Sequence, residues 1–332
     1  MLQLLRKIAF PFSLVYALVV YARNFFYDLN IFKSKSYQTP TLCVGNLSVG
    51  GTGKTPMIEF LVRLFEGHKV AVLSRGYKRQ SEGFLLADKN SSVLDLGDEP
   101  YQLHQKFPEI TVAVDADRRN GIAQLETMVK PEIILLDDAF QHRKVKPSFS
   151  ILLTAYGHLY VDDWYLPTGN LRDSKKEAKR ANIIIVTKCP EKLSESEKKK
   201  IHDKLNPLPH QNVLFSTLEY DSVLKGEHAE NLPLVEIKGK KVALVTGIAS
   251  PEPLVRYLES MGLEFEHFEF GDHHHFSEKD MAQFKGHELV LTTEKDYVRL
   301  KGKVENLFYL EVAHSFSSED QTFLKNTLKN LI

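Results

Sequence analysis

Residues 48–55 read Ser48-Val49-Gly50-Gly51-Thr52-Gly53-Lys54-Thr55, just after the apolar run Thr41–Gly45. An apolar strand, a glycine-rich turn and Gly-Lys-Thr in this order are typical of a phosphate-binding loop, or P-loop, that opens a helix. Glycines let backbone N–H groups point at phosphate oxygens, and the helix N-terminus adds partial positive charge. Lys54 would neutralise the β- and γ-phosphates, and the Thr55 hydroxyl would reach Mg²⁺. We therefore expect all eight residues to bind a nucleoside triphosphate, with ATP and Mg²⁺ as the ligands.

The first position of the loop differs from the usual pattern G-x-x-x-x-G-K-[ST], because the chain has Ser48 where that pattern has glycine. Gly50 and Gly51 must then supply the tight turn. An ordinary glycine-rich strand–helix loop is the competing interpretation. We favour nucleotide binding, because the strand, the Gly-Lys-Thr sequence and the helix stand in the order that a P-loop requires.

Short apolar runs separated by helix-length stretches extend outward from the loop. Such runs indicate strands buried on both faces, as in a parallel sheet. The expected strands are Thr41–Gly45, Val70–Ser74, Thr111–Val114, Ile133–Asp137, Ile151–Thr154 and Ile183–Thr187. Their alternation with helices predicts an α/β fold, namely a doubly wound, mostly parallel sheet of the P-loop NTPase type.

A second, smaller α/β unit is expected after residue 240. It would contain strands at Val242–Thr246, Glu264–Phe270 and Leu289–Thr293. Residues 318–332 predict a closing helix with Ser318 as its cap.

Two extended segments, Val213–Tyr220 and Leu232–Ile237, are expected to join the two units as linker strands. The predicted organisation is an N-terminal membrane-associated helix at 1–30, a P-loop domain at 31–210, linker strands at 211–240, and a second α/β domain with the C-terminal helix at 241–332.

The bulk composition is that of an ordinary globular protein. Of 332 residues, 43% are hydrophobic and 26% are charged, which argues against a disordered chain and against a polytopic membrane protein. Lys and Arg together number 43, as do Asp and Glu, so no overall positive field favours nucleic acid. The two cysteines, Cys43 and Cys189, are too far apart for a disulfide framework or a zinc site of usual spacing. We expect a reducing compartment, no nucleic-acid partner and a monomer.

The N-terminus is basic and carries an apolar stretch. Ile8–Ala22 is only fifteen residues long and contains Pro11, whereas a spanning helix needs roughly 20 apolar residues. Three interpretations compete: a cleaved signal peptide, a buried core helix, and a helix lying on the cytoplasmic membrane face. Export would separate the P-loop from ATP. Cations that include Arg6, Lys7 and Arg23 flank a stretch rich in Phe, Tyr and Leu, so we favour the membrane surface.

Two acidic pairs suit phosphoryl transfer. Ile133–Asp138 is an apolar strand ending in Asp137 and Asp138, a Walker-B arrangement in which a carboxylate holds Mg²⁺ directly or through water. We place Asp138 slightly ahead of Asp137 as the metal ligand. Asp98 and Glu99 lie on a turn before a helix, where Asp98 is either a catalytic base or, as spacing alone favours, a helix cap.

Residues 272–275 have the most unusual local composition, Asp272-His273-His274-His275. Side chains of adjacent histidines diverge in any regular structure, which argues against a shared metal ion. A catalytic histidine, or one that orients an acid, is the favoured interpretation because imidazole titrates near neutral pH. A solvated loop is the alternative.

Arginines follow several predicted strands, where the carboxyl edge of a doubly wound sheet faces its ligand. Singly, each is more often part of a surface ion pair, but together they suggest an anionic substrate. They are Arg75, Arg118, Arg119 and Arg172.

Taken in order, these segments resemble one family, the tetraacyldisaccharide 4'-kinase of lipid A biosynthesis. The likeness covers nearly the whole chain, and the family's loop also has serine in place of the first glycine. The matching segments are Val44–Pro56, Ser74–Tyr77, Gly97–Pro100, Asp137–Arg143, Leu166–Arg172, Asp272–His274 and Thr293–Asp296. The chain departs from the family pattern at Ala139, where glycine is expected, and at 147–150 and 173–174.

The resemblance implies a kinase that transfers the γ-phosphate of ATP to the 4'-hydroxyl of a lipid-linked glucosamine disaccharide 1-phosphate. It implies action at the cytoplasmic face of the bacterial inner membrane. It also implies two α/β domains joined by a two-stranded linker, with the site in the cleft between them.

The same likeness assigns roles to residues of this chain. Asp98 would be the general base, and His273 from the second domain would orient and tune it. Thr55 and Asp138 would hold Mg²⁺, and Arg172 would stabilise charge near the transferred group. The residues expected to bind the acceptor substrate are Arg75, Tyr77, Glu99, Arg119, Gln141 and His142.

The residues alone are also compatible with two other functions. A P-loop GTPase or ATPase switch is one, since Val186-Thr187-Lys188-Cys189 superficially resembles the guanine-reading Asn-Lys-x-Asp, although it lacks both the Asn and the Asp. The other is a membrane adaptor that binds nucleotide without catalysis.

Overall fold

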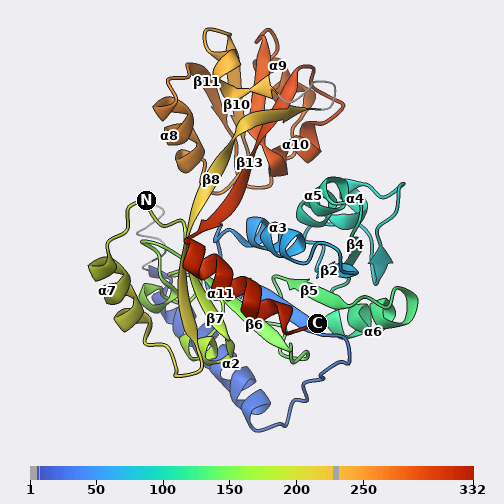
Figure 1. Ribbon diagram of the computed structural model, residues 1–332, viewed down its shortest axis with the longest axis vertical. Helices are drawn as coiled ribbons and strands as arrows, with labels where there is room; N and C mark the ends of the chain where they lie inside the picture. The colour runs from blue at the N-terminus through green and yellow to red at the C-terminus, as the bar shows by residue number, and fades with distance from the viewer. Residues whose placement is uncertain (1–5, 7, 227–231) are drawn as a thin grey trace.

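The computed structural model describes residue 6, residues 8–226 and residues 232–332. Residues 1–5 and Lys7 of the predicted N-terminal helix, and residues 227–231 of the predicted linker, lie outside the described residues. Figure 1 shows two units, a larger one below and a smaller one above, bridged by two long strands.

The larger unit is a mostly parallel sheet with helices on both faces, as the alternating apolar runs predict. Its strand order is β8-β7-β6-β1-β5-β2-β4-β3, in which β3 pairs antiparallel with β4 and the other neighbours pair parallel. Apolar side chains on both faces form two buried clusters. The strands are β1 (Thr41–Asn46), β2 (Val70–Ser74), β3 (Leu85–Leu86), β4 (Thr111–Val114), β5 (Ile133–Asp137), β6 (Phe149–Ala155), β7 (Ile183–Thr187) and β8 (Asn212–Gly226). The helices are α3 (Lys54–Leu64), α4 (Val93–Leu96), α5 (Asp98–Lys106), α6 (Arg118–Met128) and α7 (Glu195–Leu205), with 3-10 turns at Tyr160–Asp162 and Lys175–Arg180.

The central position of β1 brings the predicted motifs together. β1 lies between β5 and β6, and its Val44 is in register with Asp137 of β5. Because parallel strands end at the same edge, the P-loop after β1 and the acidic pair at the end of β5 lie side by side.

The strands of the smaller unit continue the same hydrogen-bonded sheet and pair parallel with one another. β10 lies between β11 and β12, and β12 pairs with β13 (Leu307–Phe316). The three strands predicted here are confirmed as β10 (Val242–Thr246), β11 (Phe265–Glu269) and β12 (Leu289–Thr293). The helices are α8 (Glu252–Ser260), α9 (Glu278–Gln283) and α10 (Glu294–Leu300). α10 packs on α5 of the larger unit, so the two units touch away from the linker (Figure 1).

The linker is the antiparallel pair β8 and β13 (Leu307–Phe316), which cross between the units in Figure 1. The prediction of Leu232–Ile237 as the second linker strand is wrong. That segment is the short strand β9 (Leu232–Pro233) and a 3-10 helix, whose Leu234 and Ile237 are buried in the core of the smaller unit. A short apolar run looks the same whether it packs into a core or spans between units.

The C-terminal helix belongs with the larger unit, not with the second domain as predicted. α11 (Ser318–Lys329) places Leu324 and Leu328 in the buried cluster that contains Leu42 of β1. The chain returns along β13, so α11 packs on the larger unit. Ser317, rather than Ser318, caps this helix by accepting a hydrogen bond from the backbone N–H of Asp320 at 3.1 Å.

The N-terminal helix α2 (Phe10–Asp28) lies on the outside of the larger unit (Figure 1). Its buried residues are Ser13, Val20 and Asn24, so the buried-core-helix interpretation is wrong. No helix among the described residues combines the length and the apolar character that a membrane crossing requires.

Candidate active site

The P-loop runs into α3, whose first two residues are Lys54 and Thr55, as the Gly-Lys-Thr sequence predicts. Gly53 precedes the helix with a φ of 83°, in the left-handed region that favours glycine. A Cβ at Gly53 would also lie 2.9 Å from Nε2 of His314. Gly50 has a φ of 119°, so it supplies the turn in place of a glycine at position 48.

Hydrogen bonds from neighbouring segments hold the loop against the protein body. Oγ1 of Thr187, at the end of β7, donates to the carbonyl of Thr52 at 2.9 Å. The backbone N–H of Val49 donates to the carbonyl of Asn170 at 2.8 Å. These two bonds fix the loop to the end of β7 and to the segment that contains Asn170.

His314 supports the loop from the linker strand β13, a role that sequence reasoning missed. Its Nε2 lies 2.9 Å from the carbonyl oxygen of Gly53, which can only accept, so Nε2 carries the proton. The hydroxyl of Ser216 on β8 then donates to Nδ1 at 3.0 Å. Burial lowers the pKa of His314 to about 4, so the ring is neutral at pH 7. A lone His in a late strand carries no motif that could have pointed to this role.

Lys54, Asp138 and Arg172 meet beside the loop. Nζ of Lys54 is 3.8 Å from Oδ1 of Asp138, and both terminal nitrogens of Arg172 donate to the same carboxylate, one of them at 3.0 Å. Burial acts to raise the pKa of Asp138, but the charges of Lys54 and Arg172 lower it to about 2. Asp138 is therefore a fully ionised acceptor next to the phosphate site.

Asp137 has a different environment. It is the buried last residue of β5, and it accepts a hydrogen bond from the hydroxyl of Ser74 at 3.0 Å. Burial raises the pKa of Asp137 to about 6, and the charge of Asp138 adds to this effect. Asp137 thus titrates near neutral pH and is the less suitable of the two as a direct cation ligand.

The residues at the loop fit a Mg²⁺ ion bound together with nucleotide phosphates. The Thr55 hydroxyl and the Asp138 carboxylate are the hard oxygen ligands that Mg²⁺ prefers. The hydroxyl of Ser48 is buried without a partner among the described residues, which leaves its hydrogen-bonding capacity for a polar ligand. The described chain holds no cluster of three or more His, Cys, Asp or Glu able to bind a metal, so phosphates would complete the coordination.

Asp98 and His273 face each other across the two units. Nδ1 of His273 lies 2.8 Å from Oδ2 of Asp98. Asp98 is the first residue of α5 and Gly97 is its N-cap, so the helix-cap interpretation of Asp98 is wrong. His273 has a φ of 57°, a left-handed conformation that turns it away from its neighbours. His274 instead bonds Asp280 at 3.0 Å, so the adjacent histidines diverge as expected.

Two cations of α10 complete this cluster, and sequence reasoning missed both roles. Nε and Nη2 of Arg299 donate to the Asp98 carboxylate at 3.1 and 2.5 Å. Nζ of Lys295 lies 2.9 Å from Nε2 of His273 and 3.1 Å from Glu99. The sequence did contain a signal for these two residues. Lys295 and Arg299 follow the Thr293-Glu294 pair and are four residues apart, and residues with this spacing share one face of a helix.

These partners define the protonation of the cluster. An ammonium group only donates, so Nε2 of His273 accepts from Lys295, and Nδ1 carries the proton that it donates to Asp98. Burial acts to raise the pKa of Asp98, but hydrogen bonds from His273 and Arg299 hold that pKa well below its usual range.

The remaining predicted substrate residues divide into two groups. Tyr77 and Glu99 lie at the Asp98 cluster, since the ring of Tyr77 meets that of His273 edge-on at 5.3 Å. The others are placed elsewhere along the same edge. Arg119 pairs with Asp117 at 3.1 Å, His142 is 3.6 Å from Asp117, Gln141 donates to the carbonyl of Asn46 at 2.7 Å, and Arg75 is exposed. Arg118, by contrast, is buried and donates to the backbone carbonyl of Asp137 at 3.4 Å.

A buried ionic cluster joins the two units behind the site. Nζ of Lys106, on α5, contacts Glu59 of α3 and Glu294 of α10 at 2.6 Å each, and Glu311 of β13 at 3.1 Å. α5 also carries Asp98 and α10 also carries Arg299, so the same two helices are held together at both ends.

Comparisons with known proteins agree with this architecture. The family model described as tetraacyldisaccharide-1-P 4'-kinase matches residues 5–332. A tetraacyldisaccharide 4'-kinase of Flavobacterium johnsoniae is 51% identical over 97% of this chain and 96% of its own length. One of Bacteroides thetaiotaomicron is 45% identical over 89% of this chain and 83% of its own length.

A solved structure gives the same result at the level of the fold. The "apo" form of LpxK from Aquifex aeolicus in complex with ATP superposes with a TM-score of 0.81 and 31% identity, covering 98% of this chain and 99% of that one. The P-loop, the paired aspartates and the inter-unit cluster therefore lie in a shared framework, and the chain belongs to the tetraacyldisaccharide-1-P 4'-kinase family.

Proposed function

We propose that this protein is an ATP-dependent kinase that phosphorylates the 4'-hydroxyl of a lipid-linked glucosamine disaccharide 1-phosphate. The observation that carries the proposal is the pairing of Asp98 with His273 next to a P-loop. Lys54 at the P-loop and Glu99 at the start of α5 are both near enough to Asp137 for their charges to affect its pKa, which supports a common site. A carboxylate that can accept a proton, beside a site for a triphosphate, suits transfer of a phosphoryl group to an alcohol.

In the proposed reaction the acceptor hydroxyl oxygen bonds to the γ-phosphorus of ATP, while the bond from that phosphorus to the β,γ-bridging oxygen breaks. The hydroxyl proton passes to Asp98, and ADP leaves. A carboxylate has about four acceptor sites, and His273 and Arg299 use three of them on Asp98. One site remains for the sugar hydroxyl.

The low pKa of Asp98 fits such a reaction. Phosphoryl transfer passes through a loose transition state in which positioning and charge stabilisation outweigh base strength. An ionised Asp98 held by His273 and Arg299 supplies a fixed acceptor rather than a strong base. Lys54 and Arg172 would stabilise negative charge on the transferred group, and a bound Mg²⁺ would supply further charge neutralisation at Thr55 and Asp138.

The acceptor is a lipid, and α2 has the surface to meet a membrane. Polar groups of this helix face the protein: Oγ of Ser13 donates to the carbonyl of Tyr165 at 3.0 Å, and Nδ2 of Asn24 donates to Asp173 at 2.7 Å. Apolar side chains face outward. The most exposed are Phe12, Val15, Leu18 and Val19, each at least 62% exposed.

This polarity is the reverse of an ordinary surface helix, whose apolar stripe faces the core. A contiguous exposed apolar face marks a membrane or protein contact. The positive charge of Arg23, which pairs with Asp173 at 2.9 Å, lies on the same helix. We therefore propose that α2 rests on the cytoplasmic face of the inner membrane, with the protein acting as a peripheral monomer.

We further propose that the cleft between the units opens and closes about β8 and β13. Asp98 and His273 come from different units, so closure would assemble the acceptor site only when both substrates are bound.

A transfer assay tests the main proposal. Purified protein is given labelled ATP, Mg²⁺ and the lipid disaccharide 1-phosphate in detergent, and the bisphosphorylated lipid is sought. Lys54→Ala and Asp98→Asn variants, checked for folding by circular dichroism, serve as inactive controls. Absence of product from the wild type, under conditions where another kinase of this type is active, would refute the proposal. Hydrolysis of ATP without an acceptor would instead favour a switch ATPase.

A further inference from the structure

Lys188 reaches the P-loop from the end of β7 and has no role in the mechanism above. It follows the last residue of that strand, with a left-handed φ of 57°. This backbone conformation turns the chain over the edge of the sheet. Its Nζ lies 3.8 Å from the position that a Cβ would take at Gly51, so the ammonium group rests against the middle of the loop.

The ammonium group of Lys188 makes no hydrogen bond or ion pair with any residue of the described chain. The side chain is half-buried, and burial lowers the pKa of Lys188, while the charge of Glu252 acts in the opposite direction. Desolvating a cation without a partner costs free energy, so an unpaired cation of this kind usually binds an acceptor group of a ligand. The other cation at the loop, Lys54, already has Asp138 at 3.8 Å.

The strand order places Lys188 at one particular end of a bound nucleotide. β7 lies two strands from β1 on the side of β6, whereas β5 with Asp137 lies on the opposite side of β1. Neighbouring strands are about 4.8 Å apart, so the tip of β7 is roughly 10 Å from that of β1. The γ-phosphate end is fixed on the β5 side, where Asp138 lies and where α5 presents Asp98. A triphosphate that crosses the P-loop therefore directs its ribose and base toward β7.

From this arrangement we propose that Lys188 forms one wall of the ribose-and-base end of the ATP site. Its methylene stem packs against the purine face, and its ammonium group donates to oxygen atoms at the ribose end. The proposal rests on the proposed function, in which ATP is the phosphoryl donor, and adds a residue that sets affinity for the nucleoside.

The neighbours of Lys188 fit this role. The hydroxyl of Thr187 donates to the carbonyl of Thr52, which locks the end of β7 to the loop and so fixes the position of the next residue. When Lys188 is matched to the lysine of the guanine-reading Asn-Lys-x-Asp motif, Thr187 stands in place of the Asn and Pro190 in place of the Asp. Pro190 has no carboxylate to accept the N–H groups of guanine, so this segment can hold a purine without selecting guanine.

Equilibrium binding separates the base end from the phosphate end. ATP and inorganic tripolyphosphate are each measured by competition against a fluorescent ATP analogue, with no lipid acceptor present. The variants are Lys188→Ala, which removes both stem and charge, and Lys188→Met, which keeps the stem. Lys192→Ala, an exposed lysine in the following turn, is the matched control. Circular dichroism checks the folding of each variant.

We expect Lys188→Ala to weaken ATP binding by roughly tenfold, the value of one lost polar contact with its packing. Lys188→Met should lose less ATP affinity than Lys188→Ala. In both variants the affinity for tripolyphosphate should stay within about twofold of the wild type. Unchanged ATP affinity in Lys188→Ala would overturn the proposal. An equal loss for ATP and tripolyphosphate would also overturn it, by placing Lys188 on the phosphate chain. Failure of the wild type to bind ATP at all would instead count against the proposed function.

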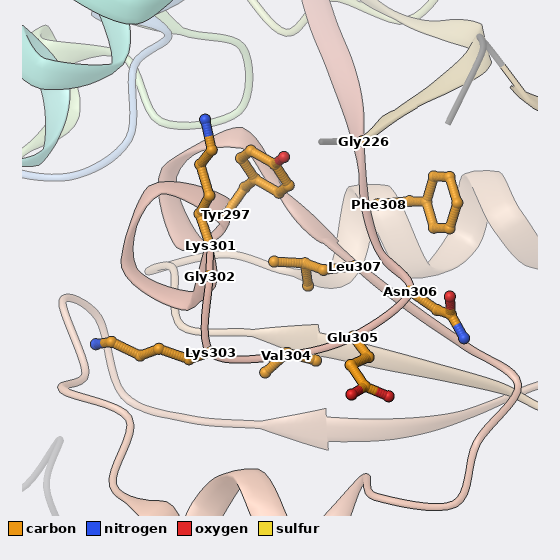
Figure 2. Close-up of a pocket in the computed structure, with 10 residues that line it drawn as sticks. All are labelled: Gly226, Tyr297, Lys301, Gly302, Lys303, Val304, Glu305, Asn306, Leu307 and Phe308. Atoms are coloured by element: carbon orange, nitrogen blue, oxygen red, sulfur yellow. The ribbon is translucent and has the colours of Figure 1, made fainter. Parts of the chain in front are cut away.

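The cavity drawn in Figure 2 is a separate feature. It lies in the smaller unit where α10 leads into β13, and its lining includes Tyr297 and Phe308 but none of the residues of the active site.

Discussion

Nδ1 of His273 donates a hydrogen bond to Oδ2 of Asp98 over 2.8 Å, although the two residues are 175 positions apart in the chain. Each comes from a different unit, and neither helix α5 nor the loop after β11 could hold the pair alone. The acceptor side of the site therefore exists only when the two units are together.

The first prediction concerns this pair. His273→Gln should lower kcat by about 100-fold or more, because Asp98 loses the donor that orients it while the P-loop is untouched. The KM for ATP should stay within about twofold of the wild type. Steady-state transfer assays at saturating lipid measure both constants. A large rise in the KM for ATP with unchanged kcat would show that His273 acts in nucleotide binding instead.

The second prediction uses Arg299. Arg299→Met removes two hydrogen bonds that lower the pKa of Asp98, while burial, which raises that pKa, remains. The pKa of Asp98 should therefore rise toward its usual range, so kcat/KM of the variant should fall at a higher pH than that of the wild type as the solution is acidified. Arg299→Lys restores a cation, so the acidic limb of its kcat/KM profile should lie between those of Arg299→Met and the wild type. Identical acidic limbs in all three proteins would contradict this role for Arg299.

The third prediction concerns the buried imidazole of His314. Its pKa is about 4 in the folded protein, below the unfolded value of about 6.5, so the unfolded chain binds the proton first as the pH falls. The folded state thus loses stability between about pH 6.5 and pH 4, on the order of 3 kcal/mol from this group. His314→Asn should flatten that part of the profile. Urea unfolding of both proteins at several pH values measures it, and equal slopes would refute the assignment.

The fourth prediction tests the ionic cluster between the units. Lys106→Met leaves the carboxylates of Glu59 and Glu294 buried without their shared cation. Removing one partner of a buried ion pair costs about 3–5 kcal/mol, so the melting temperature should fall by several degrees. Lys199→Met, which breaks an exposed pair with Asp203, should cost about 0.5 kcal/mol or less and is the control. Equal falls in melting temperature for the two substitutions would show that the buried ionic cluster does not stabilise the folded protein.

The fifth prediction concerns the outer face of α2. Leu18→Glu places a charge at a position that is 70% exposed, so the fold should be unaffected while the free energy of membrane binding becomes less favourable. Cosedimentation with vesicles containing anionic lipid should show a several-fold lower bound fraction. Leu94→Glu, on an exposed apolar residue of α4, is the matched control. Retained binding of the Leu18 variant would exclude this face as the membrane contact.

Features with a short-range signature can be predicted from the sequence. The strands buried on both faces, from Val70–Ser74 to Leu289–Thr293, are predicted nearly to the residue, because an apolar run bounded by polar residues is typical of a buried parallel strand. The P-loop and the acid pair after β5 have equally local patterns. The association of Asp98 with His273 comes from the family resemblance, since spacing alone favours a helix cap.

Long-range pairing leaves no such signature. β13 escapes prediction, because the chain returns to β8 only after the whole smaller unit has been built. The positions of Arg299 and Lys106 depend on how α10 docks on α5, which the local pattern of either helix does not encode. His314 escapes prediction for the same reason, since its partner Gly53 is 261 positions away.

The crossing strands have a mechanical consequence. Ser216 on β8 and His314 on β13 lie where the two linker strands meet the larger unit, and His314 donates a hydrogen bond to the carbonyl of Gly53 in the P-loop. The hinge about which the smaller unit would move is therefore in direct contact with the nucleotide-binding loop. A rotation of the smaller unit about this bridge would act on Gly53 through His314, so we expect closure of the cleft and binding of the triphosphate to be coupled.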